Sequence, residues 1–327
     1  MTELLTDDEK GICRAADLLR CGKLVAFGTE TVYGLGADAS DASAVAAIYA
    51  AKNRPAFNPL ISHFPDAHSA FRHVIPSPQA LKLAECFWPG PLTLVLPVSP
   101  DSLICDLARA GLNTAAVRVP SLPGVQMLLR QTDRPIAAPS ANPSGGISPS
   151  TAEHVMKGLN GRIAAVLDTG PCDVGLESTI IDLSGEQPRL LRAGGISVEK
   201  IVAAIGPVLM GDENVETSAP IAPGQLSSHY APDLPIRLNA TSVGPKEALL
   251  AFGLPLKGSP LVWNLSETES LEEAASRLFS GLHHLDHEGR KEELQGIAVQ
   301  PIPKHGLGLA IHDRLSRAAA PRPKVVS

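Results

Sequence analysis

The first residues that could do chemistry are Lys52 and Arg54, two cations that stand two positions apart. In extended backbone such a pair can straddle a polyphosphate, because lysine supplies a point charge and arginine a bidentate pair of donors. The same residues follow the end of a predicted helix, where cations stabilise the helix dipole without binding a ligand. The spacing alone therefore leaves both a phosphate site and a helix cap open.

Two further clusters could hold anionic groups. Thr114 and Arg118 alternate on one face of a predicted strand, an arrangement that suits a carboxylate or a phosphate but equally an edge-strand salt bridge. The loop SANPSGG, which begins at Ser140, could hold an anion with its backbone N–H groups or could be a plain turn. Neither cluster identifies a ligand by itself.

The common sequence signatures of other sites are absent. There is no G-x-x-x-x-G-K-[ST] motif, and no G-x-G-x-x-G motif lies between a strand and a helix. A Ser-His-Asp triad has no G-x-S-x-G elbow to support it. His283, His284 and His287 lie on one predicted helix, but no Cys or carboxylate at ligand spacing completes a metal site, so we expect a solvated helix face.

Short strands and capped helices must position these clusters in the first 206 residues. Helices are expected at 7–21 (capping box Thr6–Glu9), from Asp41 to Lys52, after the capping box Ser150–Glu153, and from Ser197 to Gly206. Strands are expected at 23–27, 113–120, 164–170, 178–184 and 189–194, a turn followed by a strand at 88–98, and a strand that enters a tight polar loop at 135–146. Many short strands with few helices between them favour an α+β or mixed sheet over a doubly wound one.

The pattern changes after Pro207. Proline, glycine, serine and acidic residues fill the chain to about Pro235, as in an interdomain linker. Beyond it, expected strands and helices alternate, with strands at PIRLN, PLVWNL and GIAVQPI and helices near 244–252, 268–288 and 307–318. This alternation predicts a small parallel sheet covered by helices.

Composition excludes several classes of protein. The 327 residues are 44% hydrophobic and 19% charged, which is typical of a globular chain long enough for two domains. A net charge of −6 argues against general nucleic acid binding, because such binding needs a basic surface. The acidic start MTELLTDDEKG and the lack of a long apolar run predict a cytoplasmic location and no membrane contact. Five cysteines without a C-x-x-C pair indicate neither a disulfide framework nor zinc.

Eight blocks in order resemble the signature segments of the threonylcarbamoyl-AMP synthase family, in its YrdC-like long form. They are FGTETVYGLGAD, AAKNRPAFNPLISH, WPGPLTLVL, NTAAVRVP, APSANPSGGISPSTAEHV, ESTIIDL, LLRAGGIS and APGQLSSHYAP. The resemblance implies an α/β fold of α+β type: a YrdC-like domain with a twisted mixed sheet and a concave basic pocket, followed by a small Rossmann-like parallel domain. The expected bounds are 1–206 for the catalytic domain, 207–234 for a linker or lid, and 235–327 for the C-terminal domain.

The resemblance also implies the reaction. L-threonine, bicarbonate or CO2 and ATP, with Mg2+ as helper, give threonylcarbamoyl-AMP and pyrophosphate, which is nucleotidyltransferase chemistry. The product serves N6-threonylcarbamoyladenosine modification of tRNA through downstream tRNA threonylcarbamoyl-transferase proteins, and no stable nucleic acid binding is expected. Two alternatives stay open: a non-enzymatic RNA-binding module, and a YrdC-like enzyme that transfers a carbamoyl group.

Residue by residue, the resemblance assigns two sets of site residues, with no protein-bound metal site. The threonine set is Thr31, His63, Arg118 and Ser178. The ATP set is Lys52, Arg54, Asn58, Thr114, Ser140, Asn142, Ser148, Arg192 and Tyr230. Lys52 and Arg54 are also assigned the catalytic role, because cations around a leaving pyrophosphate stabilise its developing charge.

Overall fold

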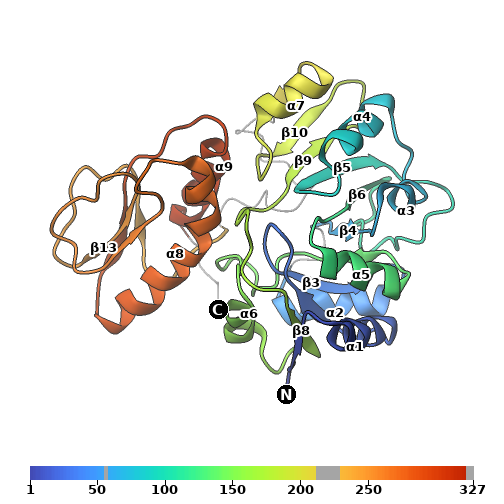
Figure 1. The fold of residues 1–327 in the computed structure, drawn as a ribbon, viewed down its shortest axis with the longest axis horizontal. Coiled ribbons are helices and arrows are strands. Elements are labelled where there is room, and N and C mark those ends of the chain that lie inside the picture. Colours follow the sequence, from blue (N-terminus) through green and yellow to red (C-terminus); the bar gives the residue numbers. More distant parts are fainter. Residues whose placement is uncertain (55–57, 211–228, 322–327) are drawn as a thin grey trace.

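The computed structural model describes residues 1–54, 58–210 and 229–321 of the chain. These residues form an N-terminal part (1–210) with an 11-stranded sheet and a C-terminal part (235–321) with a 4-stranded sheet. Figure 1 draws the N-terminal part in blue to yellow and the C-terminal part in orange to red, side by side. The mixed α/β class and the second, parallel sheet are as the sequence predicts.

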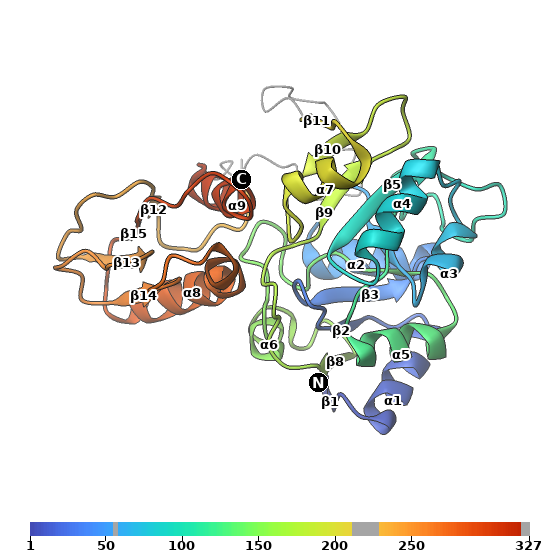
Figure 2. The same cartoon turned by 45° about the horizontal axis from the view of Figure 1, so that its top comes forward.

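The large sheet mixes parallel and antiparallel neighbours in the order β1-β8-β2-β3-β7-β4-β6-β5-β9-β10-β11. Its strands are β1 (Glu3–Thr6), β2 (Val25–Phe27), β3 (Gly34–Asp38), β4 (Ile61–His63), β5 (Leu92–Pro97), β6 (Thr114–Arg118), β7 (Ile136–Ala137), β8 (Ala165–Asp168), β9 (Thr179–Asp182), β10 (Arg189–Arg192) and β11 (Leu209–Met210). Figures 1 and 2 show how the sheet twists between β8 and β10.

Alternate residues along β2 enter two separate cores, one on each face of the sheet. Val25 and Phe27 pack with α1 (Glu9–Arg20) and α5 (Pro123–Thr132), whereas Ala26 belongs to the larger core on the other face. The helices that contribute to this larger core are α2 (Ala42–Lys52), α3 (Ala67–Phe71), α4 (Pro78–Phe87), α6 (Ala152–Leu159) and α7 (Val198–Ile205). The period of two places successive strand residues on opposite faces, so both faces need helices.

The register of the central strands brings polar residues together. His63 of β4 pairs with Arg118 of β6, and Thr93 of β5 pairs with the same arginine from the other side. In turn Thr93 is the partner of Ile180 in β9, two residues after Ser178. Four segments that are far apart in sequence therefore present side chains to one place.

The C-terminal sheet is parallel throughout, but one of its strands was predicted as a helix. Its order is β12 (Ile236–Arg237), β15 (Gly296–Val299), β13 (Glu247–Ala251) and β14 (Val262–Asn264), with helices α8 (Leu271–Lys291) and α9 (Gly308–Ala319). The predicted helix near 244–252 is β13. The segment EALLA consists of good helix formers. Its residues nevertheless pack into two different cores, one on each face of the sheet. Burial on both faces is typical of a strand in a parallel sheet, and here it outweighs the helix propensity of the residues.

Two predicted helix caps are also wrong, each by one or two residues. The side chain of Asp8, not Thr6, accepts the N–H of Gly11 at the start of α1, because Thr6 is the last residue of β1. Thr151, not Ser150, caps α6 through the N–H of His154. Asp41 and Ser197 cap α2 and α7 as predicted, and Gly206 ends α7. Of the predicted linker or lid, residues 211–228 lie outside the described residues.

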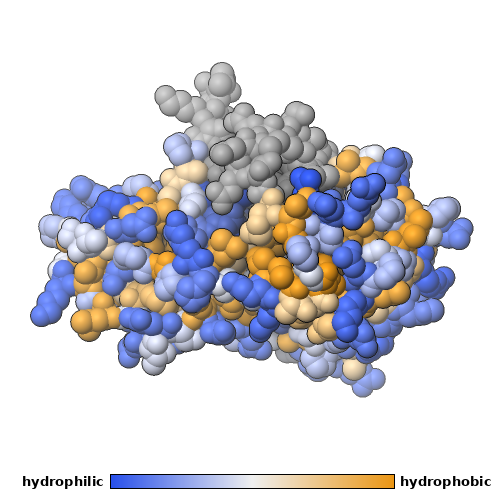
Figure 3. Space-filling model, turned by 90° about the horizontal axis from the view of Figure 1, so that it is seen from above, coloured by the Kyte–Doolittle hydropathy of each residue, from blue (hydrophilic) through white to orange (hydrophobic). Residues whose placement is uncertain are grey.

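Helices α8 and α9 face the N-terminal part (Figures 1 and 2). His283 of α8 stacks on His154 of α6, with ring centroids 3.9 Å apart, and only His287 is well exposed to solvent. The expected solvated histidine face is therefore wrong for His283, which lies in the contact between the two parts. Seen from above, polar and apolar residues are mixed over both parts, and apolar residues gather in a larger patch on the N-terminal part (Figure 3).

Three expected absences can be examined in the described residues. Across the described ranges, no helix is long and apolar enough to span a membrane. The same ranges contain no group of three potential metal-ligating side chains. All five cysteines, each within those ranges, are free thiols.

Candidate active site

A buried cavity of about 50 Å³ lies at the ends of β4 and β6, where the threonine set converges. All four members of that set line it, together with Arg54, Ser140, Arg192 and Tyr230 of the ATP set. The volume holds a few water molecules, whereas drug-sized ligands occupy roughly 300–1,000 Å³. The cavity of this structure is therefore smaller than a nucleotide.

Arg118 is held by residues of the segment that follows β2. Its guanidinium forms a salt bridge with Glu30 and donates a 3.0 Å hydrogen bond to Oγ1 of Thr31. The second carboxylate oxygen of Glu30 accepts the backbone N–H of Ser121 at 3.1 Å. Glu30 was not among the predicted site residues, although it stands beside Thr31 in the block TETVYG. A fixed guanidinium of this kind suits a small carboxylate ligand.

His63 lines the same cavity in its neutral form. Its ring is 3% exposed, and burial, helped by the nearby Arg118, lowers its pKa to about 3. The Nδ1 atom has no hydrogen-bond partner among the described residues. A neutral imidazole with a free ring nitrogen can accept or donate one hydrogen bond to a ligand.

Ser178 belongs to a network of hydroxyl groups beside an arginine. Its Oγ lies 2.7 Å from Oγ1 of Thr93 and receives a 3.1 Å hydrogen bond from Nη2 of Arg192. Arg192 also donates through Nε and Nη2 to the carbonyl of Ser178, at 3.1 and 2.9 Å. These contacts hold the serine of the threonine set against an arginine of the ATP set, so the two sets meet here.

Arg54 brings a second guanidinium to the cavity. Its Nη2 donates a weak 3.4 Å hydrogen bond to the carbonyl of Pro59, and no carboxylate of the described residues lies within salt-bridge distance. Burial lowers the pKa of Arg54 to about 10, so the group remains a cation at neutral pH. A buried cation whose charge is not neutralised is a favourable place for a phosphate.

Lys52 does not line the cavity. It is 1% exposed, and its Nζ donates to the carbonyls of Ser140 and Asn142. Burial, with a smaller effect from Arg54, lowers the pKa of Lys52. The side-chain amide of Asn142 in turn donates to the carbonyls of Pro143 and Gly146, both at 2.9 Å. In this structure Lys52 therefore contacts the loop that begins at Ser140 and fixes it in place.

The cavity is not lined by three further members of the ATP set, Asn58, Thr114 and Ser148. Asn58 is fully buried, and its side-chain amide has no hydrogen-bond partner among the described residues. Thr114 stands at the opposite end of β6 from Arg118 and does not line the cavity. Ser148 is buried and donates a 2.6 Å hydrogen bond to Glu177. The structure thus separates cavity-lining cations from residues that hold their surroundings.

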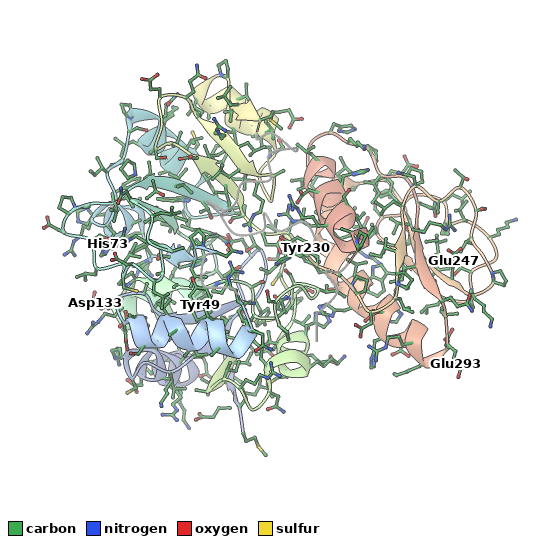
Figure 4. All side chains as sticks on the ribbon, turned by 180° about the vertical axis from the view of Figure 1, so that it is seen from behind. Tyr49, His73, Asp133, Tyr230, Glu247 and Glu293 are labelled. Atoms are coloured by element: carbon green, nitrogen blue, oxygen red, sulfur yellow. The ribbon has the colours of Figure 1, made fainter. Side chains whose placement is uncertain are left out.

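Tyr230 closes one side of the cavity, next to His229. Figure 4 shows Tyr230 at the junction of the two parts. Its backbone is left-handed, with φ of 63°, which is rare for a bulky side chain and marks strain held by surrounding contacts. Burial raises the pKa of Tyr230 to about 12 and lowers that of His229 to about 3, so both groups are uncharged at neutral pH.

Besides Glu30, sequence reasoning missed two functional candidates, Glu177 and Arg314. Glu177 lines the cavity, and Arg314 of α9 forms a fully buried 2.9 Å salt bridge with it. Glu177 could have been noticed, because it opens the block ESTIIDL. Arg314 carries no sequence signal, since nothing in the chain indicates which residue of α9 meets the N-terminal part. Fold and site together define an α/β protein with a buried cavity suited to anionic ligands.

Comparisons with known proteins identify the family. One family model, described as telomere recombination and covering Sua5, YciO and YrdC proteins, matches residues 17–194, and the model of the threonylcarbamoyl-AMP synthase C-terminal domain matches residues 196–320. A protein of Bacillus subtilis (strain 168) named threonylcarbamoyl-AMP synthase is 40% identical, over 98% of this chain and 96% of that protein. A protein of the same name from Pyrococcus abyssi (strain GE5 / Orsay) is 41% identical, over 94% of each.

A solved structure agrees with these matches. The crystal structure of P. abyssi Sua5 complexed with L-threonine has a TM-score of 0.88 at 37% identity, covering 98% of this chain and 97% of that chain. This chain belongs to the threonylcarbamoyl-AMP synthase family, as its sequence predicts. It is accordingly an enzyme of the nucleotidyltransferase type that acts in tRNA modification, and the synthase name implies ATP as a substrate.

Proposed function

We propose that this chain makes threonylcarbamoyl-AMP in the cavity described above, with the threonine set around the amino acid and the cavity-lining arginines around the triphosphate. The observation that carries this assignment is the meeting of both sets at Ser178 and Arg192, whose contact joins them directly. The P. abyssi protein solved with L-threonine supports a threonine site in this fold.

Each substrate group has a complementary partner. Arg118 binds the threonine carboxylate, and Thr31, His63 and Ser178 bind its hydroxyl and amine regions. A polar site of this kind rejects an amino acid without the hydroxyl, because buried polar groups would be left unpaired. Arg54 and Arg192 line the cavity and supply positive charge for the phosphates.

The reaction needs alignment more than covalent help from the protein. The amine of threonine adds to CO2 and loses a proton, which gives N-carboxy-threonine. An oxygen of this carbamate then attacks the α-phosphorus of ATP, and the bond from that phosphorus to the bridging oxygen breaks to release pyrophosphate. Arg54 and Arg192 stabilise the charge that develops on the leaving group. Lys52 contributes by fixing the 140–146 loop beside them.

Mg2+ enters this proposal with ATP rather than as a resident ion. The described residues offer no cluster of three metal-ligating side chains, and Mg2+ is commonly held by phosphates, water and one or two carboxylates. When bound, the ion neutralises phosphate charge. The chain's own arginines orient the triphosphate in either case.

The proposed domains have the bounds that the sequence predicts. We propose residues 1–206 as the catalytic domain, 207–234 as the linker and 235–327 as the C-terminal domain. The family's place in tRNA modification supports a cytoplasmic location and transfer of the product to downstream tRNA threonylcarbamoyl-transferase proteins.

Pyrophosphate release tests the assignment. We expect release from ATP only when L-threonine and bicarbonate are both present, with L-valine as the matched control amino acid. Release that ignores threonine would overturn the proposal. A filter-binding titration with tRNA addresses the RNA-binding alternative, which predicts tight, steeply salt-dependent binding without ATP. Turnover of carbamoyl phosphate without threonine would instead support the carbamoyl-transfer alternative.

A further inference from the structure

One side chain of the C-terminal part reaches the lining of the cavity from behind. Arg314 lies in the middle of α9 and has no exposed surface. Its Nε donates to Oε2 of Glu177 at 2.9 Å, and its Nη1 donates to the carbonyl of Ala193 at 2.8 Å. Both partners belong to the N-terminal part, so the arginine crosses between the parts.

Glu177 links Arg314 to the residues of the cavity. Its other carboxylate oxygen, Oε1, accepts the 2.6 Å hydrogen bond from Ser148, and Glu177 itself lines the cavity. The next residue, Ser178, carries the contacts to Thr93 and Arg192. A change in the position of Glu177 would therefore move members of both substrate sets.

The same arginine also holds Tyr230. Its guanidinium carbon lies 5.5 Å from the centre of the Tyr230 ring, a distance at which a cation attracts the ring face. Phe279 of α8 contacts the ring at 5.5 Å between centroids, and the carbonyl of Arg317 accepts the N–H of His229. Both C-terminal helices thus support a tyrosine whose backbone is strained.

Charge adds a second reason why Arg314 matters. Burial would raise the pKa of Glu177, but Arg314 and then Arg192 outweigh it and hold that pKa below its usual value. Glu177 is consequently a buried anion at the proposed site for the ATP triphosphate and the threonine carboxylate. Without Arg314 its charge would repel them, because little solvent is present to screen it.

We propose that Arg314 is a positioning residue of the synthase reaction, through which the C-terminal part completes the substrate cavity by holding Glu177 and Tyr230. This inference rests on the proposed function for its substrates. It differs from a purely structural tie between the parts, which would affect stability and leave substrate binding unchanged.

Three variants separate these possibilities: Arg314→Met, Arg314→Lys, and Arg314→Met combined with Glu177→Gln. Steady-state pyrophosphate release gives kcat and the KM for ATP and threonine, at a temperature well below each variant's unfolding midpoint. We expect Arg314→Met to raise the KM for ATP about tenfold or more, as for directly coupled residues. Arg314→Lys should recover part of the loss. The double variant should also bind ATP better than Arg314→Met, because it removes the uncompensated charge.

Ser280→Ala is the matched control, because the Ser280 hydroxyl contacts Ser150 across the same interface without touching the cavity. It should leave both KM values within about twofold, as expected for an exposed or peripheral contact. An Arg314→Met variant with a lower unfolding midpoint and unchanged KM and kcat would overturn the inference. So would a double variant that is no better than Arg314→Met.

A binding measurement keeps the inference independent of turnover. Calorimetric titration of each variant with ATP reports the same order of affinities, wild type above Arg314→Lys above Arg314→Met. If the wild-type chain released no pyrophosphate, the proposed function would be wrong. The ATP affinities of the variants would still show whether Arg314 positions residues of the cavity. If Arg314→Met did not fold, Arg314→Lys would decide alone: equal ATP affinity to wild type would overturn the inference.

Discussion

The threonine set and the ATP set differ in how the fold uses them. Every member of the threonine set lines the cavity. Three of its side chains, those of Thr31, Arg118 and Ser178, are already bonded to one another or to buried partners, whereas Nδ1 of His63 has no partner among the described residues. The ATP set is divided: its guanidiniums line the cavity, whereas Lys52, Asn142 and Ser148 make hydrogen bonds away from it. Under the proposed assignment, the amino-acid side is therefore organised before binding, and the nucleotide side contains both groups that would bind the ligand and residues that support them.

Because of this difference, mutations can distinguish residues that bind substrate from residues that hold the cavity in shape. A change at a preorganised, paired charge should damage stability and binding together, because the partner is left buried and alone. A change at an uncompensated cation should damage turnover with little loss of stability. A change at a supporting residue should act mainly on stability.

Arg118→Met should have the largest effect. It leaves the Glu30 carboxylate buried without its cation, which typically costs about 3–5 kcal/mol in the free energy of unfolding. The KM for threonine should rise as well. Urea unfolding and pyrophosphate release measure the two. Arg14→Met, which breaks an exposed pair with Glu3, is the control and should cost less than about 1 kcal/mol. Equal costs for the two variants would contradict the comparison.

Arg54→Ala should come next. Loss of an electrostatic contact to the transition state typically lowers kcat by about 10²–10³-fold. Because Arg54 has no carboxylate partner within salt-bridge distance in the described residues, the unfolding midpoint should change little. Circular dichroism and pyrophosphate release check this, with Arg54→Lys as the conservative variant. Loss of helicity in parallel with activity would return Arg54 to the role of a helix cap.

Lys52→Met should destabilise the protein by about 1–3 kcal/mol, because two buried carbonyls lose their donor. The KM for ATP should rise only as far as the weaker support of the 140–146 loop accounts for, because Lys52 does not line the cavity. Lys157→Met, at an exposed helix pair, is the control for losing a lysine charge. A rise in KM for ATP without any change in unfolding would restore Lys52 to direct phosphate binding.

The share of acid destabilisation that comes from His63 should be the smallest effect; burial also lowers the pKa of His229 to about 3, so His229 adds a share of its own that the His63 variant keeps. The folded pKa of about 3 for His63 lies below the ordinary value of 6.5, so the unfolded chain binds more protons between these values. Stability from the neutral ring is present above pH 6.5 and is lost as the pH falls below it. Between pH 6.5 and 5.5 the loss should be about 1 kcal/mol. Urea unfolding of His63→Gln should show a correspondingly weaker pH dependence than wild type or the exposed-site control His287→Gln. An unchanged dependence would contradict a buried neutral His63.

The sequence predicted the start of a helix correctly where a single capping residue determines it. Asp41 and Ser197 cap helices because a short acceptor side chain precedes an amphipathic run. The segment EALLA failed as a prediction because its residues favour a helix in isolation, whereas β13 is surrounded by apolar contacts on both faces. Helix α4 at Pro78–Phe87 and α5 at Pro123–Thr132 were overlooked although each begins with a proline in its first turn.

The sequence by itself determined the family, the two-part α/β class and the residue types of the site, because these depend on motifs and on local spacing. Only the tertiary structure decided that Lys52 contacts carbonyls and that Glu30 holds Arg118. It also decided that Arg314 reaches the site from 137 residues along the chain beyond Glu177. Such pairings depend on strand register and on how α9 packs against the N-terminal part, which single-sequence periodicity does not encode.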